Sequence, residues 1–183
     1  ACLAALPAQP TKGFNDEILI FAVMLLDKYA ALVQFLSVAP RWVWHLSAKK
    51  DILMYEETTR SIRITVKPFY LDDQSSPEDE HYVFAYQVKI ENQGGETVQL
   101  RNRYWQITDG YGRQQEVRGE GVVGEQPVIN PGDSFEYTSG TPLGTPSGIM
   151  AGSYEMVTSD GESFDAVVPA FSLDSPYARK QLN

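Results

Sequence analysis

The chain has 183 residues, of which 43% are hydrophobic, and this combination is typical of one compact domain with a short appendage. Its formal net charge of −9 argues against nucleic acid or an anionic membrane as the main partner, because both are bound by basic patches. Cys2 is the only cysteine, so an internal disulfide is excluded, which is consistent with a reducing, cytoplasmic location.

The first 53 residues differ from the remainder in charge and composition. They carry five basic and four acidic residues, against ten basic and twenty acidic residues in 54–183, and they are rich in Ala and Leu. We therefore expect two parts, an N-terminal extension at 1–53 and a folded domain at 54–183.

The extension has two interpretations. Its pattern over 15–38 predicts one or two helices with Asn15 as N-cap, which would form a short appendage packing its apolar side. Alternatively, the segment is translated sequence upstream of a native start at Met54. A membrane anchor is not favoured, because the apolar run at 17–26 is about half of the roughly 20 residues that a span needs.

From Ser61 onward the apolar residues recur with a period of two, which is typical of strands with one buried face. The expected strands cover 62–66, 82–90, 97–108, 113–117, 134–138, 154–158 and 163–168. An acidic loop at 71–80 and turn signals at 93–95, 109–110, 130–132, 144–148 and 160–161 separate them. Seven or eight strands without intervening helical periodicity predict an all-β, antiparallel β-sandwich.

Residues 119–124, Gly-Glu-Gly-Val-Val-Gly, fit the G-x-G-x-x-G pattern of dinucleotide-binding loops. In that motif a helix must follow the glycines, so that its N-terminus faces the phosphates. Here Pro127 and the turn at 130–132 follow within a few residues and prevent a helix, and the lysine of a Walker A motif is missing. Dinucleotide binding of the Rossmann type is therefore excluded.

Two interpretations of this glycine-rich loop stay open. Gly119, Gly121 and Gly124 can satisfy a tight backbone path at positive φ, with no ligand involved. Alternatively, their N–H groups converge on an anion, and Arg113 and Arg118 add positive charge. These five residues are the candidate site for a phosphate-containing ligand.

Four runs of sequence together resemble a known family. They are LRNRYWQITD at 100–109, EVRGEGVVGEQP at 116–127, NPGDSFEYTSG at 130–140 and PAFSL at 169–173. The chain closely resembles the ApaG family in these runs, and the resemblance covers essentially all of 54–183. Two departures are visible, since many members have histidine where Tyr104 stands and cysteine where Thr141 stands.

The resemblance implies a fibronectin type III-like (immunoglobulin-like) sandwich and favours Met54 as the native start. It also implies a link to cobalt and magnesium tolerance in bacteria, while eukaryotic relatives of the domain look like interaction modules.

The residue inventory of 54–183 argues against catalysis. The segment has no cysteine, one histidine (His81) and no G-x-S-x-G nucleophile elbow. Zinc binding by His/Cys spacing is impossible. We expect no enzymatic activity, no catalytic residue, no metal site and no cofactor.

Three functional expectations follow. The first is a non-enzymatic interaction module that binds a protein partner, or itself as a homodimer, through a sheet face or an edge strand. The second is weak binding of a phosphate-containing small molecule or nucleotide at 119–124. The third is an effect on divalent cations by direct carboxylate coordination. Neither nucleic acid nor a membrane is an expected partner.

Overall fold

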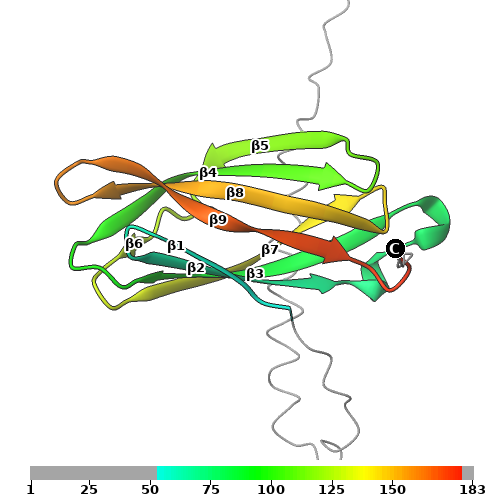
Figure 1. Cartoon of the computed structure of the whole chain (residues 1–183), viewed down its shortest axis with the longest axis horizontal. Helices are drawn as coiled ribbons and strands as arrows, with labels where there is room; N and C mark the ends of the chain where they lie inside the picture. Colours follow the sequence, from blue (N-terminus) through cyan, green and yellow to red (C-terminus); the bar gives the residue numbers. More distant parts are fainter. Residues whose placement is uncertain (1–52, 179–183) are drawn as a thin grey trace, which may run out of the picture.

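The computed structural model describes residues 53–178, which form two antiparallel β-sheets packed face to face (Figure 1). One sheet has the strand order β1-β2-β3-β7; the other has the order β5-β4-β8-β9, and β6 also pairs with β4. The strands are β1 (Tyr55–Thr59), β2 (Ile62–Tyr70), β3 (Tyr82–Asn92), β4 (Val98–Asp109), β5 (Gln114–Glu120), β6 (Val128–Ile129), β7 (Ser134–Leu143), β8 (Ser147–Thr158) and β9 (Ser163–Asp174). The all-β antiparallel sandwich predicted from the sequence is confirmed, and the helices expected at 15–38 lie outside the described residues.

The core lies between the two sheets and is built from the alternate positions that the sequence pattern singled out. Trp105 of β4 lies at its centre, with its ring centroid 5.5 Å from that of Tyr86, 5.8 Å from that of Tyr154 and 6.1 Å from that of Phe171. All four side chains are buried. Such tilted and edge-to-face aromatic pairs add to the stabilisation that burial alone provides.

The strand β1 has no apolar alternation, which is why its sequence gave no signal. It is positioned by a two-residue turn in which Arg60 and Ser61 have φ of 45° and 64°, so that Thr59 pairs with Ile62. Positive φ at both central residues matches a type I′ hairpin turn, which usually contains Asn or Gly. With the two-residue β6, this strand brings the total in 53–178 to nine, against the seven or eight expected.

A β-bulge changes the direction of side chains within β4. Leu100 is buried, but the register against β8 shifts between Leu100 and Asn102, and the inward positions beyond the bulge are 103, 105 and 107. An extra residue reverses the alternation of faces along a strand. The bulge therefore turns Arg103 toward the interior and Tyr104 outward.

The two sides of the sandwich differ. On one side the edge strands β1 and β9 meet, as Figure 1 shows: Val167 N–H donates to Thr59 Oγ1 over 3.1 Å, and the hydroxyls of Tyr55 and Ser172 lie 2.8 Å apart. On the other side the edge strands are β5 and β7, and neither pairs with a further strand among residues 53–178. The sandwich is thus closed along β1 and β9 and open along β5 and β7.

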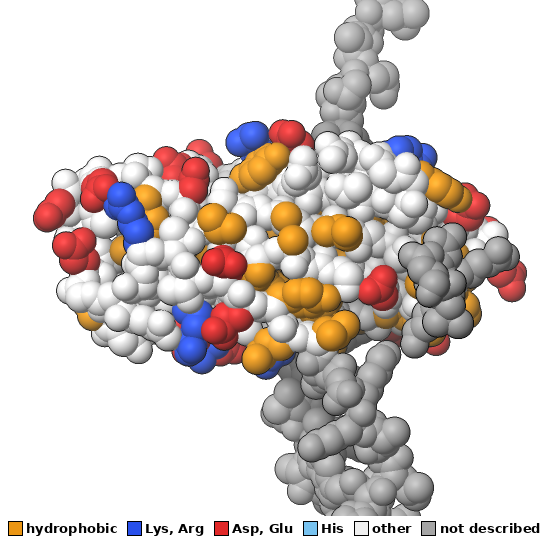
Figure 2. Space-filling model, viewed as in Figure 1, with side chains coloured by type: hydrophobic (Ala, Val, Ile, Leu, Met, Phe, Trp, Pro, Cys, Tyr) orange, Lys and Arg blue, Asp and Glu red, His pale blue; other side chains and the backbone are white. Residues whose placement is uncertain are grey.

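Hydrophobic side chains on the face seen in Figure 2 lie in several groups, the largest near the middle of the view, with polar atoms between the groups. Single exposed apolar side chains are normal for a soluble surface and indicate no binding site by themselves. The open side, where β5 and β7 are unpaired within 53–178, is the better candidate for a functional site.

Candidate functional site

The glycine-rich segment begins inside a strand rather than in a loop. The strand β5 extends to Glu120, and Gly119 pairs with Arg103 of β4, so only residues 121–124 leave the sheet. The expectation of a loop over the whole of 119–124 is therefore wrong for residues 119 and 120, which belong to β5. Val122 and Glu125 close the turn with reciprocal backbone hydrogen bonds of 2.8 and 2.9 Å.

Part of the expected N–H cluster is already engaged by the protein. The N–H of Gly121 donates to Arg101 O over 2.8 Å, and that of Val122 donates to Glu125 O. The N–H groups of Val123 and Gly124 have no acceptor within 53–178. Both residues have positive φ, of 47° and 83°. Two adjacent N–H groups are therefore left to face solvent or a ligand.

Gly121 and Gly119 differ in what a side chain at each position would meet. A Cβ on Gly121 would lie 2.1 Å from Glu125 O, and φ there is +55°, so no other residue fits without moving the backbone. A Cβ on Gly119 would lie 2.9 Å from Arg103 Nη2, while its backbone is in no unusual region. Gly119 thus makes room for a guanidinium group.

Arg113, a predicted site residue, does not lie with the glycines. It stands just before β5, at the strand end opposite to the turn at 121–124. Its Nε donates to Asp109 Oδ2 over 2.6 Å, and its guanidinium lies over the Tyr111 ring. The structure therefore separates Arg113 from the rest of the predicted phosphate site, because the β4–β5 hairpin binds it.

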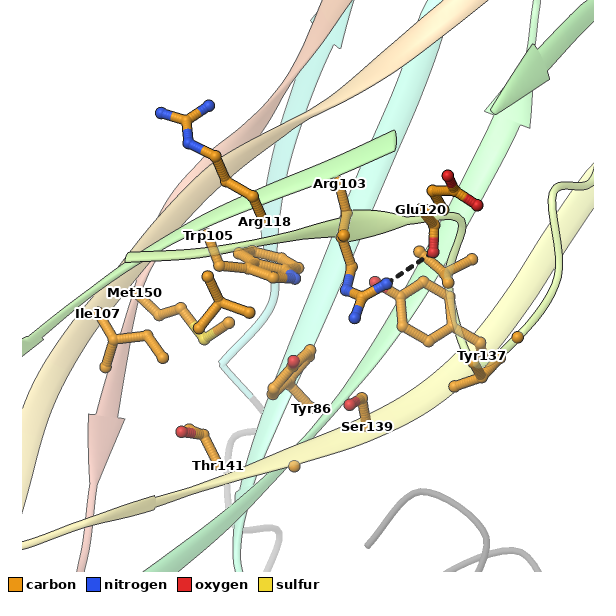
Figure 3. A pocket seen from close by; sticks show the side chains of 16 residues that line it. Tyr86, Arg103, Trp105, Ile107, Arg118, Glu120, Tyr137, Ser139, Thr141 and Met150 are labelled. Carbon is orange, nitrogen blue, oxygen red and sulfur yellow. Dashed lines mark hydrogen bonds between the residues drawn. The ribbon is translucent and has the colours of Figure 1, made fainter. Parts of the chain in front are cut away.

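Arg118 lies beside the turn but on the outer surface of the sheet. It points away from the space between the sheets (Figure 3). Its guanidinium carbon lies 4.1 Å from the centre of the Tyr104 ring, and Nη2 is 3.5 Å from Glu116 Oε2. Its side chain is 71% exposed, so it can contact a ligand only from the solvent side.

Arg103, which sequence reasoning did not single out, extends into the space between the sheets (Figure 3). Its Nη1 donates to Glu120 O and Gly121 O, both over 2.8 Å. The sequence did contain a signal, because Arg103 stands two residues before Trp105 and so shares its face of the strand. The bulge that turns this face toward the core could not be recognised in the sequence.

Arg103 borders a cavity of about 240 Å³ on the open side of the sandwich. Its walls come from both sheets and from the turn at 121–124. The apolar side chains include Trp105, Ile107, Val117, Val122 and Met150, and the hydroxyl groups are those of Tyr86, Tyr137, Ser139 and Thr141. Arg118 and Glu120 also border the cavity, but the guanidinium group of Arg103 is the one that extends into the space between the sheets, above the apolar side chains.

The tyrosines at the cavity remain neutral donors. Burial raises the pKa of Tyr86, which the Ser139 hydroxyl and the Arg103 charge offset only in part. Burial also raises the pKa of Tyr137 well above its usual value, and the nearby hydroxyls of Tyr154 and Tyr86 raise it further. The hydroxyls of Tyr137 and Tyr154 are hydrogen-bonded to each other across the two sheets. Around neutral pH, the positive charge facing the cavity therefore comes from Arg103 without an opposing phenolate.

Of the two positions that depart from the family pattern, one lies outside the cavity and the other lies inside it. Tyr104 is on the outer surface beneath Arg118, whereas Thr141 is buried and lines the cavity. His81 is exposed and lies outside this site, in an isolated bridge with Ser76.

The described part of the chain offers neither a metal-binding cluster nor a membrane span. No group of three or more His, Cys, Asp or Glu side chains within 53–178 could hold a metal ion. In the same residues, no helix has the length and hydrophobicity to cross a membrane.

Comparison with known proteins gives consistent results. The sequence model of the ApaG domain matches residues 72–158. Proteins named ApaG from Paramagnetospirillum magneticum and Rhodospirillum centenum are each 66% identical over 130 residues, which cover 71% of this chain and 100% of theirs. The crystal structure of a Bordetella pertussis protein named ApaA is 45% identical, superposes with a TM-score of 0.62, and matches 68% of this chain and 98% of that one.

Proposed function

The chain belongs to the ApaG family, and we propose that it is a non-enzymatic interaction module that pairs an extended segment of a protein partner with the free edge of β7. The observation that carries this proposal is that the two sides of the sandwich differ. The edge strands β1 and β9 contact each other through hydrogen bonds, whereas β5 and β7 border a cavity.

Of the two free edges, β7 is the better template for another strand. Native edge strands are usually protected by shortness or by charge. The strand β5 has seven residues and carries charges at Glu116, Arg118 and Glu120. The strand β7 has ten residues and one charge, Glu136. An added segment therefore meets less obstruction along β7.

The hydrogen-bond pattern identifies which backbone groups of β7 face the open edge. Asn92 N–H donates to Asp133 O, and Gly132 N–H donates to Asn92 O, so the backbone groups of Asn92 point toward β7. Directions alternate along an antiparallel pair. By the register of β3 with β7, the groups of Ser139 face β3 and those of Thr138 face outward. Pro142, which has no N–H, also occupies an outward position, as is typical of an edge.

The absence of catalysis in this proposal is supported by the residues available. Within 53–178 there is no cysteine, and His81 is exposed and outside the cavity. In this proposal, the effect on cobalt and magnesium tolerance that the family resemblance implies acts through the protein partner.

Proline substitutions at neighbouring positions of β7 test the edge. Thr138→Pro should remove an outward N–H and leave the pairing with β3 intact. The matched control Ser139→Pro should lose a ladder hydrogen bond and cost roughly 2 kcal/mol more in the free energy of unfolding. Urea denaturation measures both.

Binding is then read with a photo-crosslinking amino acid at Glu136 of the full chain in cells. A specific protein adduct, including one with a second copy, should form and should disappear in the Thr138→Pro background. The same probe at Glu57 on the closed side should give none. Identical adducts from both positions, or adducts unaffected by Thr138→Pro, would refute pairing at β7.

A second candidate is phosphate binding at 119–124, favoured by the two N–H groups of Val123 and Gly124 that have no acceptor within 53–178. Arg118 is the nearby exposed cation. Calorimetry with pyrophosphate should then show weak, salt-sensitive binding that Arg118→Ala reduces. No heat at millimolar pyrophosphate would leave these glycines with a structural role alone.

A further inference from the structure

The cavity on the open side contains a cation without a counter-ion. Nη1 of Arg103 is bound to two carbonyl oxygens, but none of the ion pairs within 53–178 includes this residue. Charges withdrawn from water are normally paired, because desolvation is costly. An anionic ligand at the half-buried Arg103 would pair its charge.

We propose that the cavity between β5 and β7 binds a small organic carboxylate with an apolar body, held by the Arg103 guanidinium. Guanidinium is a planar fork that matches the two oxygens of a carboxylate, which gives the contact directional preference as well as charge. The Tyr86 and Ser139 hydroxyls border the same space and can donate to an anion there.

The apolar body of the ligand follows from the remaining walls. Trp105, Ile107 and Met150 form a hydrophobic floor beyond the guanidinium, as Figure 3 shows. A cavity of about 150 Å³ is enough for benzene. The 240 Å³ available here therefore suit one ring or branched chain carrying a short acid group.

Gly119 is the residue that permits this arrangement. The guanidinium lies where a side chain at 119 would project, at 2.9 to 3.0 Å from the position of its Cβ. The first glycine of the G-x-G-x-x-G pattern is thereby explained by the cavity, without a phosphate. The proposal stands independently of strand pairing at β7.

The test is binding of phenylacetate to the full chain, followed by NMR of backbone amides and the Trp105 indole N–H. Saturable shifts at residues around the cavity are expected, and uncharged phenylacetamide should bind at least ten-fold more weakly. Arg103→Gln should also weaken phenylacetate at least ten-fold. The matched control Arg60→Gln removes an exposed cation from the β1–β2 turn, which does not line this cavity, and should leave phenylacetate affinity unchanged.

Two further arms keep the test decisive. Thr141→Leu fills the cavity while keeping Arg103, so it should abolish binding even if Arg103→Gln unfolds. A tetrapeptide ending in phenylalanine carries the same acid on a chain end. Binding of either probe that depends on Arg103 supports the site. Tighter binding of phenylacetate indicates a free small carboxylate as the ligand, and tighter binding of the tetrapeptide indicates the C-terminus of a peptide.

The proposal is overturned by any of three results in folded protein. These are no saturable shift at millimolar phenylacetate or tetrapeptide, equal affinity for phenylacetate and phenylacetamide, or unchanged affinity in Thr141→Leu. A failure of carboxylate binding would leave the proposal of strand pairing at β7 untouched. The two are tested separately, because Thr138→Pro changes the edge of β7 and leaves Arg103 and its carbonyl partners in place.

Discussion

Arg103 and Arg118 lie on neighbouring strands of one sheet yet face opposite sides of it. The inward-facing Arg103 meets carbonyl groups and apolar walls, whereas the outward-facing Arg118 meets water and the Tyr104 ring. At the scale of single residues, the direction of a side chain relative to the sheet therefore matters more than its distance in sequence from the glycines.

The glycines at 119, 121 and 124 should differ sharply when each is replaced by alanine. Gly121→Ala brings Cβ against Glu125 O and should cost at least about 2 kcal/mol of unfolding free energy. Gly124→Ala meets no atom but keeps φ of +83°, so about 1 kcal/mol is expected. Gly119→Ala should cost less still, since only a flexible guanidinium must shift. Urea denaturation of the three variants measures this order, and equal losses would contradict it.

At the scale of elements, the β4–β5 hairpin is fixed by one carboxylate. Asp109 Oδ1 accepts from the N–H groups of Tyr111 and Arg113, both over 2.9 Å, and Oδ2 accepts from Arg113 Nε. The sequence predicted a hairpin at 109–110, and this is confirmed. What the sequence did not indicate is that Arg113 would be bound there rather than at the glycines.

The hairpin should make stability depend on pH through Asp109. Desolvation alone would raise the pKa of Asp109, but the backbone N–H and guanidinium of Arg113 and the N–H of Tyr111 outweigh it, so the net shift is downward. A lowered folded-state pKa means that the stabilisation is present above the unfolded value near 4 and is lost as pH falls through the folded value.

The comparison that checks this is Asp109→Asn against the parent chain in urea at pH 6 and pH 3. Asparagine cannot become charged, so the parent should be more stable at pH 6 and its advantage should shrink by pH 3. An advantage that stays constant over this interval would contradict the role assigned to the Asp109 charge.

At the scale of the whole molecule, residues 54–183 are predicted to fold without the first 53. Within residues 53–178, the core cluster between the two sheets is formed by side chains of the strands and of Val122. A chain beginning at Met54 should therefore show a β-type circular dichroism spectrum and a cooperative thermal transition. An unfolded spectrum would show that 1–53 is part of the folding unit.

Local sequence patterns are enough to predict the class of fold and most of its strands. The period of two is a local property, and turn residues such as Asp109-Gly110 act within a few positions, so both can be recognised without knowing what packs where. The family resemblance, carried by long runs of sequence, is confirmed as well. The exclusion of a Rossmann loop was equally local, because a proline and a turn decide it.

The residues that form the candidate site, in contrast, depend on contacts between strands that are distant in the sequence. The bulge after Leu100 depends on how β4 pairs with β8, and it alone turns Arg103 inward. Likewise, β5 and β7 border a cavity because the pairing of distant strands places them at the same side of the two sheets. Strand pairing between distant segments fixes both features, and residue spacing along one strand carries no information about its neighbours.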